Sequence, residues 1–186
     1  MLTLWIILGV IGVLIILFLA TYNGLIRLRN QVKNAWAQID VQLKRRYDLI
    51  PNLVETAKGY MTHERETLEA VTNARNLAQQ ASSGGVGARS AVEGELSTAL
   101  SRLLMVVENY PDLKANQNFL ALQEELTSTE NRISFSRQYY NDSVLHYNNQ
   151  TQMFPSNIIA NIAGFKPDEF FEVTQAAERE APKVSF

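Results

Sequence analysis

The stretch that most resembles a catalytic motif is His63-Glu64-Arg65-Glu66-Thr67. A zinc protease needs two histidines one helical turn apart, because both imidazoles must reach the same metal ion. Here Thr67 stands where the second histidine would be, and His146 is the only other histidine in the chain. We therefore expect no zinc site and interpret this stretch as a solvated helix face.

Carboxylates are plentiful, but their spacing does not predict a di-metal site. Di-iron bundles use Glu-x-x-His pairs, and no Asp or Glu stands three residues before His63 or His146. The chain also contains no cysteine, no Walker-type phosphate loop and no Gly-x-Ser-x-Gly nucleophile motif. The sequence thus predicts no catalytic set, no metal, no cofactor and no small-molecule substrate.

Three consecutive basic residues, Lys44, Arg45 and Arg46, follow closely on Asp40. They are compatible with a buried ion network, a site for an acidic partner or a plain surface patch. Three adjacent positions cover most of a helix circumference, so at least one of these side chains should approach the core. An ion pair within a helical bundle then becomes a reasonable expectation.

Two Tyr-Asn pairs, Tyr140-Asn141 and Tyr147-Asn148, are separated by seven residues and therefore share one helix face. One interpretation is an amphipathic seam in which the phenol rings pack and their hydroxyls reach partners. The other interpretation is a contact between helices or between subunits. The sequence leaves both open.

The elements that must position these residues are all helical. Apolar residues recur at spacings of three and four, and no segment alternates with a period of two. We predict an all-α chain in which an N-terminal transmembrane helix precedes an antiparallel up-and-down four-helix bundle. The predicted parts are an anchor at 1–22, a bundle at 23–165 and a tail at 166–186 with its last ten residues frayed. The predicted helices are 23–47, 51–81, 88–110, 112–153 and a short one at 156–163.

Pro51 permits two interpretations of the region between the first two bundle helices. A proline is tolerated in the first turn of a helix, so Asp48 as N-cap and Pro51 in that turn would form a tight corner. The alternative is one long helix kinked at Pro51, because the apolar phase from Ile39 to Leu53 continues almost unbroken. We favour the corner.

The first charged side chain of the chain is Arg27. An apolar stretch of about 20 residues is long enough to cross a bilayer, and it is too long for the core of a typical signal peptide. We therefore predict a retained anchor that contacts membrane lipid. Its representative residues are Leu2, Trp5, Ile6, Leu14, Leu17 and Tyr22.

The basic collar, which consists of Arg27, Arg29 and Lys33, follows the anchor directly. By the positive-inside rule the N-terminus should lie outside and the bundle in the cytoplasm. The acidic main body argues against nucleic acid as a partner. The short apolar helix expected at 156–163 could lie against the bundle or against the membrane surface.

Several blocks of this sequence closely resemble the bacterial LemA family, over nearly the whole chain up to about Phe171. The blocks are 22–30, 35–46, 48–54, 58–60, 110–115, 118–119, 123–126, 130–133, 137–141 and 154–157. The resemblance implies a single-pass inner-membrane protein with its N-terminus outside, and it favours the corner at Pro51. It implies no established enzymatic activity, an association with a membrane protease system and, for one relative, a role in magnetosome membrane formation.

The expected function is a non-enzymatic scaffold or adaptor that forms a homo-oligomer or binds a membrane partner such as a protease. A second hypothesis is membrane shaping or lipid-surface binding through the basic collar and the apolar segment 157–165. A third and remote hypothesis is an enzyme with an unrecognised site.

Overall fold

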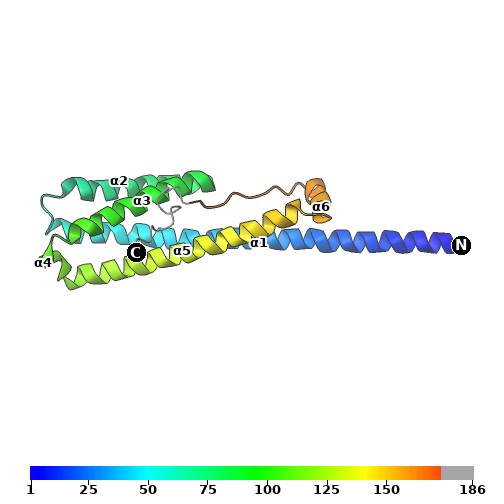
Figure 1. The fold of residues 1–186 in the computed structure, drawn as a ribbon, viewed down its shortest axis with the longest axis horizontal. Coiled ribbons are helices and arrows are strands. Elements are labelled where there is room, and N and C mark those ends of the chain that lie inside the picture. The colour runs from blue at the N-terminus through cyan, green and yellow to red at the C-terminus, as the bar shows by residue number, and fades with distance from the viewer. Residues whose placement is uncertain (173–186) are drawn as a thin grey trace, which may run out of the picture. The chain divides into compact units, whose positions relative to one another are not determined.

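The computed structural model describes residues 1–172, and within them every regular element is a helix (Figure 1). The predicted all-α fold class is therefore confirmed. The expected fraying of the last ten residues lies outside the described range. The helices are α1 (Leu2–Lys58), α2 (Arg65–Gln80), the 3-10 helix η1 (Ala81–Ser83), α3 (Val86–Val107), α4 (Pro111–Lys114), α5 (Gln117–Gln152) and α6 (Ser156–Ala163).

The chain divides into two compact units. The anchor unit comprises Met1–Gln38 and Gln138–Glu169, and the bundle unit comprises residues 39–137 with residues 170–172. The helices α1 and α5 each contribute one part to either unit. Each unit is described by itself below.

The bundle unit is formed by the last part of α1, by α2 and α3, and by the first part of α5. Successive helices run in opposite directions (Figure 1). Each helix buries one stripe of apolar side chains at three- and four-residue spacing, as expected for packing around a common core. The most deeply buried members are Ile39, Leu43, Ile50, Leu53, Val71, Ala78, Leu96, Leu103 and Phe119.

The expected corner at Pro51 is wrong, because α1 continues through this residue to Lys58. A proline inside a helix removes the hydrogen bond to the carbonyl four residues earlier, which here belongs to Tyr47. Arg75 of α2 donates its Nε–H to that carbonyl at 2.8 Å. Ile50 and Leu53 remain fully buried on either side of Pro51. The burial of Ile50 and Leu53 and the hydrogen bond from Arg75 together explain why the helix continues through Pro51.

The real break comes at residues 59–64, inside the helix expected over 51–81. The amides of Tyr60 and Met61 both donate to the carbonyl of Ala57 and so close the end of α1. Met61 then buries its side chain, and α2 begins after Glu64. His63 therefore lies in an exposed connection, so its expected place on a helix face is wrong.

The helix expected over 112–153 is also divided. The short helix α4 begins with Pro111 at its first position, where a missing amide proton costs little. Asn116 then accepts a hydrogen bond from the amide of Phe119 at 3.1 Å, which is the capping contact that starts α5. The Gly-rich stretch Gly84-Gly85 separates η1 from α3.

The anchor unit contains one helical segment that is long and apolar enough to cross a membrane, at the start of α1. Its large apolar side chains are exposed. The helix α6 ends at Gly164, whose φ of 73° is left-handed and therefore suits glycine. The amide of Phe165 returns to the carbonyl of Ala160 at 2.9 Å, which closes the helix end and turns Phe165 inward.

Candidate functional site

A network of ionisable side chains lies inside the bundle unit, and we call it the charge network. Its members are Asp40, Arg46 and Tyr47 of α1, Arg89 and Glu93 of α3, and Glu130 of α5. It joins three helices that are distant in sequence. Buried charges are costly unless they are paired and hydrogen-bonded, so the pairing of each member decides what the network can do.

Arg46 is the centre of the charge network and is only 1% exposed. Its guanidinium pairs with the Glu93 carboxylate and donates to Oε1 of Glu130 and to Oγ of Ser97, both at 2.9 Å. Burial by itself would lower the pKa of Arg46, but the Glu130 and Glu93 carboxylates outweigh this effect and raise the pKa. Arg46 is therefore held as a cation.

Glu93 is 4% exposed and has a partner for each carboxylate oxygen. One oxygen accepts from Arg46, and the other accepts from the hydroxyl of Tyr47. The Nε of Arg89 lies 3.9 Å from Oε1 of the same carboxylate. Burial, assisted by the hydrogen bond to Glu93, raises the pKa of Tyr47. Tyr47 thus keeps its proton and remains a donor.

The three consecutive basic residues have different environments. Arg46 is buried as described, whereas Lys44 is exposed and Arg45 pairs at the surface with Glu125. Asp40 pairs with Arg89, whose side chain is almost completely buried. The run that the sequence left open between a buried network and a surface patch therefore contains both.

The charged members of the network are paired with one another. Two guanidinium groups face three carboxylates, and each carboxylate forms an ion pair with an arginine. Paired charges of this kind restrain the packing and register of the helices that carry them. A polar cavity of about 260 Å³ adjoins Arg46, Glu93 and Glu130 and is also lined by Ser97 and Ser101. Within residues 1–172, no group of three or more His, Cys, Asp or Glu side chains is arranged to hold a metal ion.

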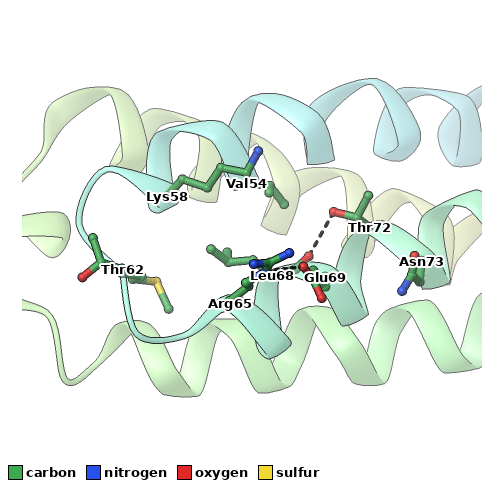
Figure 2. Close-up of a pocket in the computed structure, with 9 residues that line it drawn as sticks. Val54, Lys58, Thr62, Arg65, Leu68, Glu69, Thr72 and Asn73 are labelled. Carbon is green, nitrogen blue, oxygen red and sulfur yellow. Dashed lines mark hydrogen bonds and ion pairs between the residues drawn. The ribbon is translucent and has the colours of Figure 1, made fainter.

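A larger cavity of about 590 Å³ lies between the end of α1 and the start of α2 (Figure 2). Buried Val54, Met61 and Leu68 contribute its apolar surface. Arg65 and Glu69 are among its charged lining residues (Figure 2), and they form an ion pair with a distance of 2.6 Å between Nε and Oε1. The remaining lining residues are Lys58, Thr62, Thr72 and Asn73. The lining thus combines three apolar side chains with six polar or charged ones.

The two Tyr-Asn pairs lie in the anchor unit, where Tyr140, Tyr147 and Asn148 are buried. Asn148 exchanges hydrogen bonds of 2.9 Å with the backbone carbonyl and amide of Asp168. Tyr140 donates to the carbonyl of Glu169 at 2.9 Å, and its ring packs on Trp36 with 5.3 Å between centroids. These residues fasten residues 168–169 to α5. Asn141, their fourth member, is half-buried.

The hydroxyl of Tyr140 leads to a testable pH dependence. Burial, together with the Asp168 and Glu169 carboxylates, raises the pKa of Tyr140 to about 12. An unfolded tyrosine has a pKa of about 10, so the stabilising protonated state is fully present below that pH. We expect Tyr140→Phe to cost about 1 kcal/mol of unfolding free energy at pH 7 through the lost hydrogen bond.

As the pH rises from about 10 towards about 12, the unfolded wild-type chain loses its phenol proton first. The wild type should therefore lose stability relative to Tyr140→Phe over this window. Chemical denaturation of both proteins at pH 7, 9 and 11 measures the difference between their unfolding free energies. The other titrating groups are the same in both proteins, so their contributions cancel in this difference. A difference that stays constant to pH 11 would contradict the assignment.

The three residues of the basic collar have different environments. Arg27 and Lys33 are exposed, whereas the guanidinium of Arg29 lies over the ring of Phe165 at 5.2 Å from its centroid. Burial raises the pKa of Asp168, although Arg29 and Lys33 act in the opposite direction. All six representative anchor residues are exposed, namely Leu2, Trp5, Ile6, Leu14, Leu17 and Tyr22.

Sequence reasoning did not single out Arg89 and Glu93, which complete the charge network. Both residues fall on the apolar stripe of α3, which continues through Leu96, Leu100 and Leu103. Oppositely charged residues four positions apart on a buried stripe are a signal of an internal ion pair. Both residues lie in the helix predicted over 88–110, but the apolar stripe was counted only from Ala91 onwards, so this signal was not used.

Comparison with known proteins shows that this chain has homologues. The sequence profile described as the LemA family matches residues 35–186. Magnetosome protein MamQ 2 of Paramagnetospirillum magneticum is 27% identical over 198 residues, covering 91% of this chain and 73% of that protein. Protein LemA of Metamycoplasma hominis is 29% identical over 171 residues, covering 88% and 77% respectively. Magnetosome protein MamQ of Magnetospirillum gryphiswaldense is 24% identical over 184 residues, covering 86% and 68%. The matched range includes every member of the charge network.

Proposed function

Because the chain belongs to the LemA family, we propose that it is a non-enzymatic, membrane-anchored scaffold. Its bundle binds a second copy of itself or another membrane protein, such as a membrane protease. The observation that carries this proposal is that the ionisable side chains inside the bundle pair with one another. Arg46, Glu93 and Arg89 are paired with partners on other helices or on their own helix and serve to hold the helices together.

The surface of the bundle unit offers a position on each helix at which the proposal can be tested. Each of its four long helical segments keeps at least one large apolar side chain exposed to solvent. Examples are Val41 of α1, Leu77 of α2, Met105 of α3 and Leu120 of α5. Single exposed apolar residues are common on proteins, so their value here is as reporters: each one marks a different helix.

The proposed location is the bacterial inner membrane. The apolar start of α1 is the single span, the N-terminus lies outside, and the bundle lies in the cytoplasm. The exposed basic residues Arg27 and Lys33 immediately after the span support this orientation through the positive-inside rule. A cysteine placed at the exposed Ser82 of η1 should then be protected from a membrane-impermeant thiol reagent in intact cells.

Single-cysteine crosslinking in native membranes tests the scaffold proposal, since the chain has no cysteine of its own. The variants are Val41→Cys, Leu77→Cys, Met105→Cys and Leu120→Cys. We expect a discrete crosslinked species at one or two of these positions and none at the others, because a specific interface covers only part of the bundle surface.

The four variants serve as controls for one another. Equal crosslinking at all four positions would indicate random collision and would count against a specific interface. A chain that stays monomeric at every position, and with which no protein co-purifies from solubilised membranes, would overturn the proposal. Turnover of a substrate that is lost in a variant of the charge network would also overturn it.

A further inference from the structure

The helix α6 has one face against the protein and one face without protein cover. Ser156 and Ala160, four residues apart, are buried in the anchor unit. Ile158 and Ile162 lie on the other side and are 52% and 72% exposed. Phe154, just before the helix, is 81% exposed, and Met153 next to it is exposed as well. Large apolar side chains grouped in this way mark a contact with lipid or protein.

The position of α6 along α1 is fixed by Phe165. Gly164 ends the helix in a left-handed conformation, and Phe165 then packs edge-on against Tyr22 with 5.8 Å between ring centroids. Tyr22 closes the apolar stretch at the start of α1, and tyrosine at the end of a span prefers the headgroup level. This contact places α6 beside α1 at the end of the apolar stretch. Figure 1 shows α6 next to α1.

The charges around this position match an anionic lipid surface. Arg29 stacks on Phe165, and Arg27, Lys33 and Lys166 are exposed in the same unit. Asp168 is near Arg29 and Lys33 and offsets part of this charge. Basic residues immediately beside a span attract acidic headgroups.

We infer that α6 is an interfacial helix whose exposed face, formed by Ile158 and Ile162 together with Phe154, lies in the headgroup layer of the membrane that α1 spans. A lone span is free to rotate and tilt, and its orientation is set by interfacial anchors and by packing. The second contact lies to one side of α1, so it selects one rotation of that helix about its axis. The anchor unit then meets the membrane in a single orientation.

The inference rests on the membrane anchor of the proposed function, and the experiment includes a position that tests the anchor separately. Single cysteines at Leu14, Ile158, Ile162 and Tyr139 are labelled with an environment-sensitive fluorophore in the full chain. Each variant is reconstituted into vesicles of phosphatidylcholine and phosphatidylglycerol. The quenchers are a nitroxide carried on the lipid and iodide in the water.

Tyr139 is the matched control, since it is an exposed aromatic residue of the same unit. Its neighbour Tyr140 packs on Trp36, which lies fourteen residues beyond Tyr22 on α1, or about 21 Å along the helix. We expect the labels at Ile158 and Ile162 to lose most of their fluorescence to the lipid quencher and little to iodide. The label at Tyr139 should show the reverse.

Each other outcome is decisive. If Leu14 is quenched by lipid while Ile158 and Ile162 respond only to iodide, α6 is in water and the inference fails while the anchor stands. If the α6 labels respond to neither quencher, protein covers them and the inference fails in favour of a second copy or a partner. If Leu14 itself escapes the lipid quencher, the membrane anchor of the proposed function fails.

Discussion

Replacing Arg46 by methionine should lower the unfolding free energy of the protein by about 3–5 kcal/mol, whereas Arg45→Met should cost less than about 1 kcal/mol. The two residues are adjacent and chemically identical. Arg46 is buried between Glu93 and Glu130, whereas Arg45 makes one ion pair with Glu125 at the surface. The large effect arises because the buried Glu93 carboxylate would lose its hydrogen-bonded cation and keep only the more distant guanidinium of Arg89, at 3.9 Å.

Denaturant titrations of the full chain in mild detergent, followed by far-ultraviolet circular dichroism, measure both variants. A third variant, Arg46→Met with Glu93→Gln, removes the unpaired charge but keeps an acceptor for Tyr47. It should regain most of the lost stability, since replacing both members of a buried ion pair is often close to neutral. Equal losses for Arg46→Met and Arg45→Met would show that burial of the charge network has no energetic consequence.

The second large effect concerns the carbonyl of Tyr47, which Pro51 leaves without its helical partner. Arg75→Met should cost about 1–3 kcal/mol of unfolding free energy, because the carbonyl then loses its only replacement donor in the described contacts. In a Pro51→Ala background the helix supplies that donor itself. The cost of Arg75→Met should accordingly be much smaller there.

Pro51→Ala alone should raise the unfolding free energy, by an amount up to about 3 kcal/mol, since proline is the least favourable residue in a helix interior. The four proteins form a double-mutant cycle that can be measured by the same denaturant titrations. Its coupling free energy isolates the link between the two positions. Additive effects of the two substitutions would mean that Arg75 stabilises the bundle by another route.

The contrast at Pro51 shows how far sequence reasoning reaches in this chain. Helical spacing predicts the fold class and the stripe from Ile39 to Leu53, because periodicity is a local property of the chain. The corner was expected because the penalty of proline is local as well. The donor that relieves this penalty comes from Arg75, on another helix, and no local pattern announces it.

The charge network shows the same limit. The rule that three consecutive residues surround a helix correctly indicates that one of Lys44, Arg45 and Arg46 faces inward. The phase of the buried stripe does select Arg46, which lies three positions after Leu43 and four before Ile50. That Glu93 and Glu130 would be its partners is not contained in any local pattern. The break at residues 59–64 was missed for a related reason. Met61 is buried in the connection itself, and an apolar residue in a connection is indistinguishable by spacing from one on a helix stripe.

The hydrogen bond from Arg75 to Tyr47 also has an evolutionary consequence. A relative without proline at the position of Pro51 has no free carbonyl at the position of Tyr47. Selection for a donor at the position of Arg75 is then relaxed. Pro51 and Arg75 should therefore covary among homologues. Their side chains need not touch, because the link between them is the backbone carbonyl of Tyr47.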